Sequence, residues 1–410
     1  MAIKSFADTS AVSLAYAFSD AADAAEVLST ELNLIPYTTE GFTMAKEAKT
    51  SQAISGSRRS KGSKNTKGTA SGAFTIEFGA TPFCMDMLQA LLMNTWEQDG
   101  VSQVITDSDL KQFMVVEKTI RPNVGEFEKQ SHERYYGTLI NDATLELGDG
   151  ELITLAASTM SANADYTEEL QGADGAGGSL VPVKVVPVDY EIADASNNLK
   201  NIVITDDLGN PLEMTFSTAS LQIENNVREQ AGIGHVFAAG MGMGKVGVNM
   251  SGEVYYFDQT VLDVHMRNQR IKGEMVLETR EGKFEIYLPN MMAQSPSSNA
   301  GGENQDYTTS ITLTAEEGEH EGKTCCIFIR FTPADISGLL ATISLDSATI
   351  DNSTETVSIS GSTTNAADGS VVTVSISDGV DTINVPGVEV ASNFFNVSSV
   401  DVNVPVLRYV

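Results

Sequence analysis

Two stretches of the chain share one layout of strand, long loop and returning strand. The first runs from Phe42 to Phe78 and the second from Leu221 to Phe257. In each, the loop is rich in glycine and small residues, and the second alternating strand follows a Ser-Gly pair (Ser71-Gly72 and Ser251-Gly252). A repeated unit constrains the fold strongly, because both copies must bury equivalent faces. The sequence therefore predicts a duplicated domain whose long, exposed loops serve assembly.

The composition is that of a large, acidic, globular chain. Its 410 residues, 41% of them hydrophobic, suffice for two or three domains that each bury a core. The formal net charge of −30 argues against general nucleic-acid binding by phosphate neutralisation. The same charge suits a surface that DNA passes without adhering to it. Three cysteines, two of them vicinal, form no disulfide framework and predict synthesis in a reducing compartment.

We expect neither secretion nor a membrane span. The first ten residues, MAIKSFADTS, lack the apolar segment of a signal peptide, and no run of about 18 apolar residues occurs. The segment Ser19–Leu34 fits a helix capped by Ser19 or Asp20, or an arm that becomes ordered on assembly.

Apolar spacing predicts two further helices and a series of strands. The stronger helix is Thr81–Asn94, with Pro82 in its first turn and one apolar face; the shorter is Asp258–Asn268. A Gly148-Asp149-Gly150 turn joins two alternating runs. The predicted strands are 111–120, 135–147, 151–160, 271–278, 283–288, 308–314 and 323–331, and 295–306 is predicted to be an acidic loop.

Three domains are expected. The flexible segment GADGAGGS, at 172–179, separates a first repeat (residues 1–182) from a second (183–334). After Asp335 the only basic residue is Arg408, and short alternating strands follow one another. This tail, 335–410, resembles the immunoglobulin-like β-sandwich modules of bacterial proteins, although it lacks an inter-sheet cysteine pair.

The second loop contains a G-x-G-x-x-G pattern that we do not interpret as a nucleotide site. Dinucleotide binding needs a preceding strand and a following helix, whereas a strand-like run follows here. A phosphate-binding P-loop is also excluded, because Val246 stands where it requires Ser or Thr. We expect an adaptable interface loop that uses the backbone freedom of glycine. Its residues are Gly240, Gly242, Gly244, Lys245 and Gly247.

No constellation of catalytic, cofactor-binding or metal-binding residues stands out, so we expect no enzyme activity and no cofactor. None of the four histidines lies four residues from another or at metal-ligand spacing from a cysteine. Cys325 and Cys326 lie in a predicted strand, where adjacent side chains point to opposite faces and cannot share a metal.

Seven basic residues cluster in the first loop, with Glu47 as the only acid among them. We expect this loop to dock on an acidic surface of a neighbouring identical subunit, and a solvated loop is the alternative. Nucleic-acid contact is disfavoured, because no aromatic residues are interleaved for base stacking. The cluster comprises Lys46, Lys49, Arg58, Arg59, Lys61, Lys64 and Lys67.

Three segments resemble the major tail proteins that build the tail tube of bacteriophages with long, non-contractile tails. They are Ile54–Phe78, Thr81–Trp96 and Glu133–Met160. In that family a long loop precedes a strand with a Ser-Gly or similar turn, a helix packs on the sheet, and a strand pair follows. The likeness covers about residues 40–165 and, more weakly, 215–333. A duplicated tube domain with a C-terminal decoration is similar to the Chi-like, flagellum-seeking group of these phages.

The resemblance implies a mainly β fold. It consists of two tandem tail-tube domains, each a β-sandwich or half-barrel with a flanking helix and a long loop, followed by an immunoglobulin-like sandwich. The implied function is that of a structural subunit, polymerising as stacked rings around a channel that conducts the DNA genome into the host. Single-copy members form rings of six, so a duplicated chain would form trimeric rings with pseudo-sixfold symmetry.

The resemblance also implies partners and location. The partners are further copies of the chain, the tape-measure, tail terminator and tip proteins, and viral DNA that passes through the lumen without specific binding. The C-terminal domain would contact the host surface. The protein would be part of the virion tail, assembled in the host bacterial cytoplasm. The alternative is a bacterial surface or adhesion protein built from immunoglobulin-like modules, which would require a secretion signal.

Overall fold

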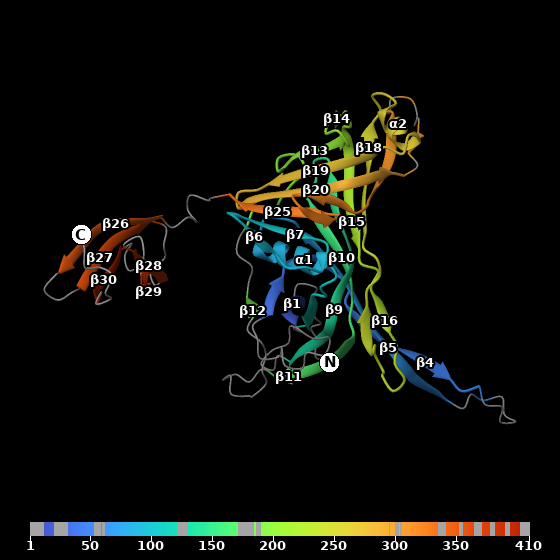
Figure 1. The fold of residues 1–410 in the computed structure, drawn as a ribbon. Helices are drawn as coiled ribbons and strands as arrows, with labels where there is room; N and C mark the ends of the chain where they lie inside the picture. Colours follow the sequence, from blue (N-terminus) through green and yellow to red (C-terminus); the bar gives the residue numbers. More distant parts are fainter. Residues whose placement is uncertain are drawn as a thin grey trace, which may run out of the picture. The chain divides into compact units, whose positions relative to one another are not determined.

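A computed structural model of the chain divides into two compact units, Met1–Ala334 and Asp335–Val410 (Figure 1). The structure describes residues 12–19, 32–52, 59, 62–120, 129–170, 184–185, 190–294, 296–299, 303, 306–334, 342–351, 356–364, 371–377, 382–389 and 394–401. No helix within these ranges is both long and apolar enough to cross a membrane.

The first unit is built mainly from antiparallel strands, and one network of 21 strands runs through it. We call residues 1–182 its first half and residues 183–334 its second half. The first half contains β1 (Val12–Ser19), β2 (Leu32–Ile35), β3 (Tyr37–Glu40), β4 (Thr43–Thr50), β5 (Ser63–Glu77), α1 (Pro82–Leu92), β6 (Glu97–Asp99), β7 (Ser102–Thr106), β8 (Phe113–Ile120), β9 (Lys129–Gly148), β10 (Thr154–Met160) and β11 (Asn163–Leu170).

The second half has a comparable set of elements. They are β12 (Lys184–Val185), β13 (Leu199–Asp206), β14 (Pro211–Leu212), β15 (Phe216–Glu224), β16 (Arg228–Gln230), β17 (Gly240–Gly242), β18 (Gly247–Tyr255), α2 (Thr260–Met266), β19 (Arg270–Glu278), β20 (Gly282–Ala293), β21 (Ser297–Asn299), β22 (Thr308–Ala315), β23 (Gly318–His320), β24 (Lys323–Cys325) and β25 (Phe328–Pro333).

The two halves pair their strands in the same order. β1 pairs with β8, and β13 pairs with β19. β8 pairs with β9, and β19 with β20. β5 lies between β4 and β10, as β18 lies between β15 and β22. β11 pairs with β9, as β25 pairs with β20, and each half places its helix after β5 or β18.

The two Ser-Gly pairs mark equivalent places in this order. Both glycines lie within a strand, and each faces a phenylalanine from the preceding strand segment. A Cβ on Gly72 would lie 2.2 Å from Phe42 Cδ1, and one on Gly252 would lie 2.9 Å from Phe216 Cδ1 and 2.4 Å from a backbone oxygen. An aromatic ring that covers a strand glycine fills the space its missing side chain leaves. Glycine is therefore required here for close approach.

The halves are joined by direct strand pairing. β15 pairs antiparallel with the C-terminal part of β9, with Leu221 opposite Leu145. At a second joint, β7 of the first half pairs with β25 of the second. The order β4–β5–β10–β9–β15–β18–β22 is thus continuous. Figure 1 shows α2 and β14 near one end of this sheet and the β4/β5 hairpin at the other.

Helix α1 packs its apolar face into the main core. Thr81 caps it by accepting a hydrogen bond from the backbone N–H of Cys84 at 3.0 Å, and Pro82 occupies the first turn. Met93, with φ of 49°, ends it in the left-handed conformation. Helix α2 is shorter and buries only Val264, while Leu262 and Met266 remain exposed. The helix predicted over Thr81–Asn94 is therefore confirmed, and that over Asp258–Asn268 is confirmed with shorter bounds.

Three sequence-based predictions are corrected. Ser19 ends β1 and Leu32–Ile35 is β2, so Ser19–Leu34 is not one helix; residues 20–31 lie outside the described ranges. The strand predicted over 323–331 is interrupted, because a bend at Cys326 separates β24 from β25. The loop predicted over 295–306 contains β21, which pairs with β22.

The second unit has five described strands in two sheets. β26 (Thr342–Asp351), β27 (Thr356–Thr364) and β30 (Phe394–Asp401) form one sheet, and β28 (Val371–Ser377) pairs with β29 (Thr382–Glu389) in the other. All described pairings within this unit are antiparallel.

We predict that Gly72→Val lowers the free energy of unfolding by about 1–3 kcal/mol, because the new side chain overlaps the Phe42 ring. Urea unfolding of unassembled protein, followed by the fluorescence of the single tryptophan, Trp96, measures it. Ser71→Val, at the exposed neighbouring position, should change stability by less than about 0.5 kcal/mol. Equal stability of the two variants would contradict the packing role of Gly72.

Candidate functional site

The continuous sheet has one apolar and one polar face. Alternate side chains such as Phe74, Leu145 and Leu221 are buried in the core. The intervening positions carry serine, threonine, asparagine and acidic side chains, and they are partly or fully exposed. Hydrogen bonds link neighbouring strands across this polar face; Thr314, for example, donates to Asn249 Oδ1 at 2.9 Å.

Over six strand segments the polar face carries negative charge only. These segments (71–77, 139–148, 154–160, 218–224, 247–255 and 308–315) contain no lysine or arginine, whereas β4 and the first part of β5 carry lysines. Their acidic residues all fall on the polar side of the alternation, and they are Glu77, Asp142, Glu146, Glu224 and Glu253. The sequence signal for this surface was the absence of cations from the polar positions of the predicted strands, and our sequence reasoning missed it.

The basic cluster of the first loop lies on a long hairpin. β4 and β5 form its two arms, so most of the predicted loop is strand, and Figure 1 shows the hairpin projecting from the sheet. Lys46 and Lys49 lie on β4, and Lys64 and Lys67 on β5; all four are exposed. Arg59 is exposed, while Arg58 and Lys61 lie outside the described residues. Two of the lysines are paired internally, Lys49 with Glu47 and Lys67 with Glu229 at 2.8 Å.

The glycine-rich segment of the second half also forms a hairpin. Gly240 and Gly242 belong to β17, which pairs with β16, while Gly247 begins β18 and Gly244 and Lys245 lie between the strands. None of these four glycines has a positive φ. Gly244 is instead a close-approach position, because a Cβ there would lie 2.6 Å from Asn226 Cβ. The expected role of backbone freedom is therefore wrong for these positions.

The loop at the tip of the β16/β17 hairpin contacts β5 of the first hairpin. The N–H of Gly68 on β5 donates to the carbonyl oxygen of Val236 at 2.7 Å. The ring of Phe237 covers Gly68, where a Cβ would lie 2.6 Å from the ring. Hydrogen bonding to Glu229 raises the pKa of Lys67, which joins the same two hairpins. The candidate assembly loops of both halves thus support each other.

A buried asparagine anchors the second hairpin to the body. The side-chain amide of Asn225 donates to the carbonyl oxygens of Leu91 (2.8 Å) and Ile140 (3.0 Å). Leu91 lies in the last turn of α1, where carbonyl groups lack partners within the helix. The backbone N–H of Asn225 donates to Asn141, which in turn accepts from Val227. One side chain therefore ties α1, β9 and the hairpin together.

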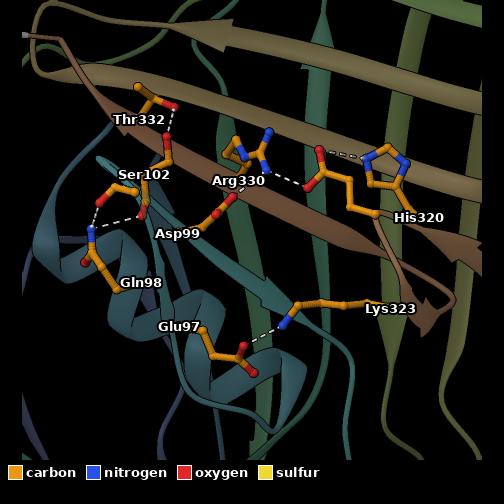
Figure 2. A network of polar contacts seen from close by, with 10 residues as sticks. Glu97, Gln98, Asp99, Ser102, His320, Lys323, Arg330 and Thr332 are labelled. Carbon is orange, nitrogen blue, oxygen red and sulfur yellow. Dashed lines mark hydrogen bonds and ion pairs between the residues drawn. The ribbon is translucent and has the colours of Figure 1, made fainter.

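The second joint is held by side chains that cross from the β6/β7 hairpin to the second half (Figure 2). These contacts couple the two halves of the first unit in addition to the β9·β15 pairing. Three side-chain pairs add to the β7·β25 strand pairing: Arg330 with Asp99 (2.8 Å), Lys323 with Glu97 (2.5 Å) and the hydroxyl of Ser102 with that of Thr332 (2.8 Å).

His132, His320 and the vicinal cysteines are packed inside the structure. His132 is buried beside Glu117, 3.0 Å away, and His320 stacks on Tyr287 with ring centroids 4.3 Å apart. Burial raises the pKa of Cys325 to about 12 and that of Cys326 to about 11, so both remain thiols at neutral pH. Across the described ranges, no group of three or more His, Cys, Asp or Glu side chains is placed to hold a metal ion.

The comparison with protein families is decisive for the class of protein. A family model described as phage tail tube protein matches residues 9–315. The chain belongs to the phage tail tube protein family. The match spans both halves of the first unit and ends before the second unit. No curated protein matches the chain.

Membership in the tail tube family identifies a structural component of a phage tail that self-assembles into a tube. The location is the virion tail, and the family is not normally enzymatic. The adhesion-protein alternative is not favoured. The basic and glycine-rich hairpins and the acidic sheet face therefore belong to a tail tube protein.

We predict that Asn225→Ala destabilises the unassembled protein by about 1–3 kcal/mol, because two buried carbonyl groups lose their donor. Urea unfolding measures the loss. Asn197→Ala, at an exposed turn position, serves as the matched control and should cost much less. If both variants lose the same stability, Asn225 does not anchor the hairpin as described.

Proposed function

We propose that this protein is the tube subunit of a long, non-contractile phage tail, and that the polar face of its continuous sheet lines the channel through which the DNA passes. The observation that carries the proposal is the charge of that face over the six segments named above, which have five carboxylates and no cation. Binding to DNA is driven largely by the release of counterions when cations neutralise phosphates. A wall without cations offers no such gain, so DNA slides past it.

The ring is proposed to contain three chains. Each chain supplies two halves with the same order of strand pairing, so three chains present six similar units around the channel. Rings stack head to tail, a contact between different surfaces that extends without closing. The tape-measure, terminator and tip proteins are the proposed partners in the tail, which assembles in the host cytoplasm.

The C-terminal unit is proposed to be an immunoglobulin-like decoration that projects outward and contacts the host surface. Its described strands form two small antiparallel sheets, and the family match ends before it. The duplicated tube domain combined with this module favours the Chi-like group.

Cryo-electron microscopy of tubes grown from the purified protein tests this proposal. We expect rings of three chains, with two similar but inequivalent domains alternating around a channel lined by Glu146 and Glu224, and with the C-terminal unit outside the wall. Six chains in a ring, or a channel lined by the apolar face, would overturn it.

The basic hairpin is proposed to dock on an acidic surface of the neighbouring ring. We predict that replacing Arg58, Arg59, Lys61 and Lys64 together by Ser leaves the subunit folded and sharply weakens polymerisation. Each exposed ion pair contributes only about 0–1 kcal/mol, but many pairs act together in every ring. Wild-type assembly should weaken with added salt, because charges are screened over about 8 Å at physiological ionic strength.

Light scattering during assembly, at low and high salt, measures both effects. A control with Lys200, Arg267 and Lys272 replaced by Ser removes exposed cations from the second half, outside the hairpin. We expect the control to assemble like the wild type. If the hairpin variant also assembles like the wild type at both salt concentrations, the docking mechanism is wrong.

A further inference from the structure

The β9·β15 pairing between the two halves leaves two equivalent strand edges unpaired among the described residues. β15, which pairs with β18 in the second half, also pairs with β9 of the first half. Its counterpart in the first half is β4, which among the described residues pairs only with β5. The counterpart of the C-terminal part of β9 is β21, which in the same ranges pairs only with β22. β4 and β21 are the two opposite edge strands of the sheet, so they cannot pair with each other within one chain.

The anchoring glycines Gly72 and Gly252 align the two halves residue by residue. Gly68 and Val248 lie four residues before Gly72 and Gly252. Gly68 pairs with Lys46 in β4, and Val248 pairs with Ile223 in β15. Lys46 therefore corresponds to Ile223.

The opposite side of the glycine strands aligns in the same way. The residue after each glycine pairs with Ser158 in β10 or Ser310 in β22. These serines lie opposite Asp142 in β9 and Ser297 in β21. The next residues along, Ala143 and Ser298, therefore correspond to each other.

A second copy of the chain fits these edges in a defined register. Inside the chain, Ala143 lies opposite Ile223. The counterpart of Ala143 is Ser298 and that of Ile223 is Lys46, so Ser298 of one copy lies opposite Lys46 of the next. At the neighbouring position, Asn299 lies opposite Ala45. A one-residue slip would turn every side chain to the other face, so the register is part of the inference.

An exposed aromatic patch provides independent support. In the second half the N–H of Tyr256 donates to the carbonyl oxygen of Tyr307 at 3.0 Å. In the glycine alignment these two residues correspond to Ile76 and Leu155 of the first half. Ile76 is 0% exposed and Leu155 2%.

Tyr256 and Phe257 line an open pocket together with residues of β13 and β14, and they stay partly exposed there. Tyr256 is 45% exposed, Tyr307 44% and the adjacent Phe257 76%. An apolar surface that is buried in one half and open in the other matches a contact made by a further copy of the chain.

We propose that neighbouring chains in a ring join by antiparallel pairing of β21 of one copy with β4 of the next, with Ser298 opposite Lys46 and Asn299 opposite Ala45, and that the same contact covers Tyr256, Phe257 and Tyr307. This inference rests on the proposed tube function and specifies the contact within it. The exposed β4 edge carries Lys46, Glu47 and Lys49, and charged edges oppose indiscriminate strand addition.

Cysteine cross-linking in assembled tubes tests the register. Two double variants place thiols at the inferred pairs, Lys46→Cys with Ser298→Cys and Ala45→Cys with Asn299→Cys. Adjacent antiparallel pairs alternate between wide and close types, so one of the two has the shorter distance. Mild oxidation should then give disulfide-linked chains in at least one variant, in a ladder that ends at three chains.

The matched controls combine the same positions out of register, Lys46→Cys with Asn299→Cys and Ala45→Cys with Ser298→Cys. Their thiols point to opposite faces of the sheet and should cross-link at least tenfold less. Cross-linking that is equal in all variants, or stronger in the controls, would overturn the register while leaving the tube function in place. Failure of the wild-type protein to form tubes would instead count against the tube function itself.

Hydrogen exchange on wild-type protein provides a second test that needs no variant. The amides of β4 and β21 should exchange more slowly in tubes than in unassembled protein, as should those around Tyr256. Unchanged exchange at both strands would overturn the inference even if the cysteine variants fail to assemble.

Discussion

The pairing of β15 with β9 is the interaction on which the rest of the first unit depends. A sheet edge exposes unpaired N–H and C=O groups, and it must be paired, covered or charged. This pairing satisfies one edge of each half and extends the buried apolar face across both, so that Leu145 and Leu221 belong to one core. It also fixes the relative position of the hairpins, because β5 and the β16/β17 hairpin are then held close enough for Gly68 to bond Val236.

Local patterns in the sequence predicted most of the strands and helices, because hydrophobic periodicity and helix capping depend on only a few neighbouring residues. The alternation at 271–278 and the Thr81-Pro82 start of α1 are examples, and both are confirmed. The predicted helix over Ser19–Leu34 failed because its two ends belong to strands. β1, which ends at Ser19, pairs with β2, which begins at Leu32, and also with β8. The pairing with β8 joins residues about a hundred positions apart, and no local rule contains it.

The residue types of the candidate site could be predicted from the sequence, but the strand pairing that positions them could not. The basic cluster and the glycine-rich segment were found from residue types alone, but β21 was hidden in a polar stretch that forms a strand only because β22 pairs with it. The glycines illustrate the same limit. Backbone freedom is the default interpretation of a glycine, whereas Gly68 and Gly244 are needed for the close approach of groups distant in sequence or across a turn. Such contacts exist only after the sheets have formed.

The charge of each surface of this chain suits the molecule or subunit that is proposed to contact it. The net charge of −30 would make association between identical subunits unfavourable if it were spread evenly. Instead the six polar-face segments hold carboxylates alone, and a group of cations is gathered on the β4/β5 hairpin at the end of that sheet. In the proposed ring, apolar and backbone contacts would have to join neighbouring chains, since like-charged faces cannot. The open strand edges and the exposed tyrosines of the second half are proposed to provide those contacts, and the cationic hairpin is proposed to provide ionic attraction for stacking along the tube.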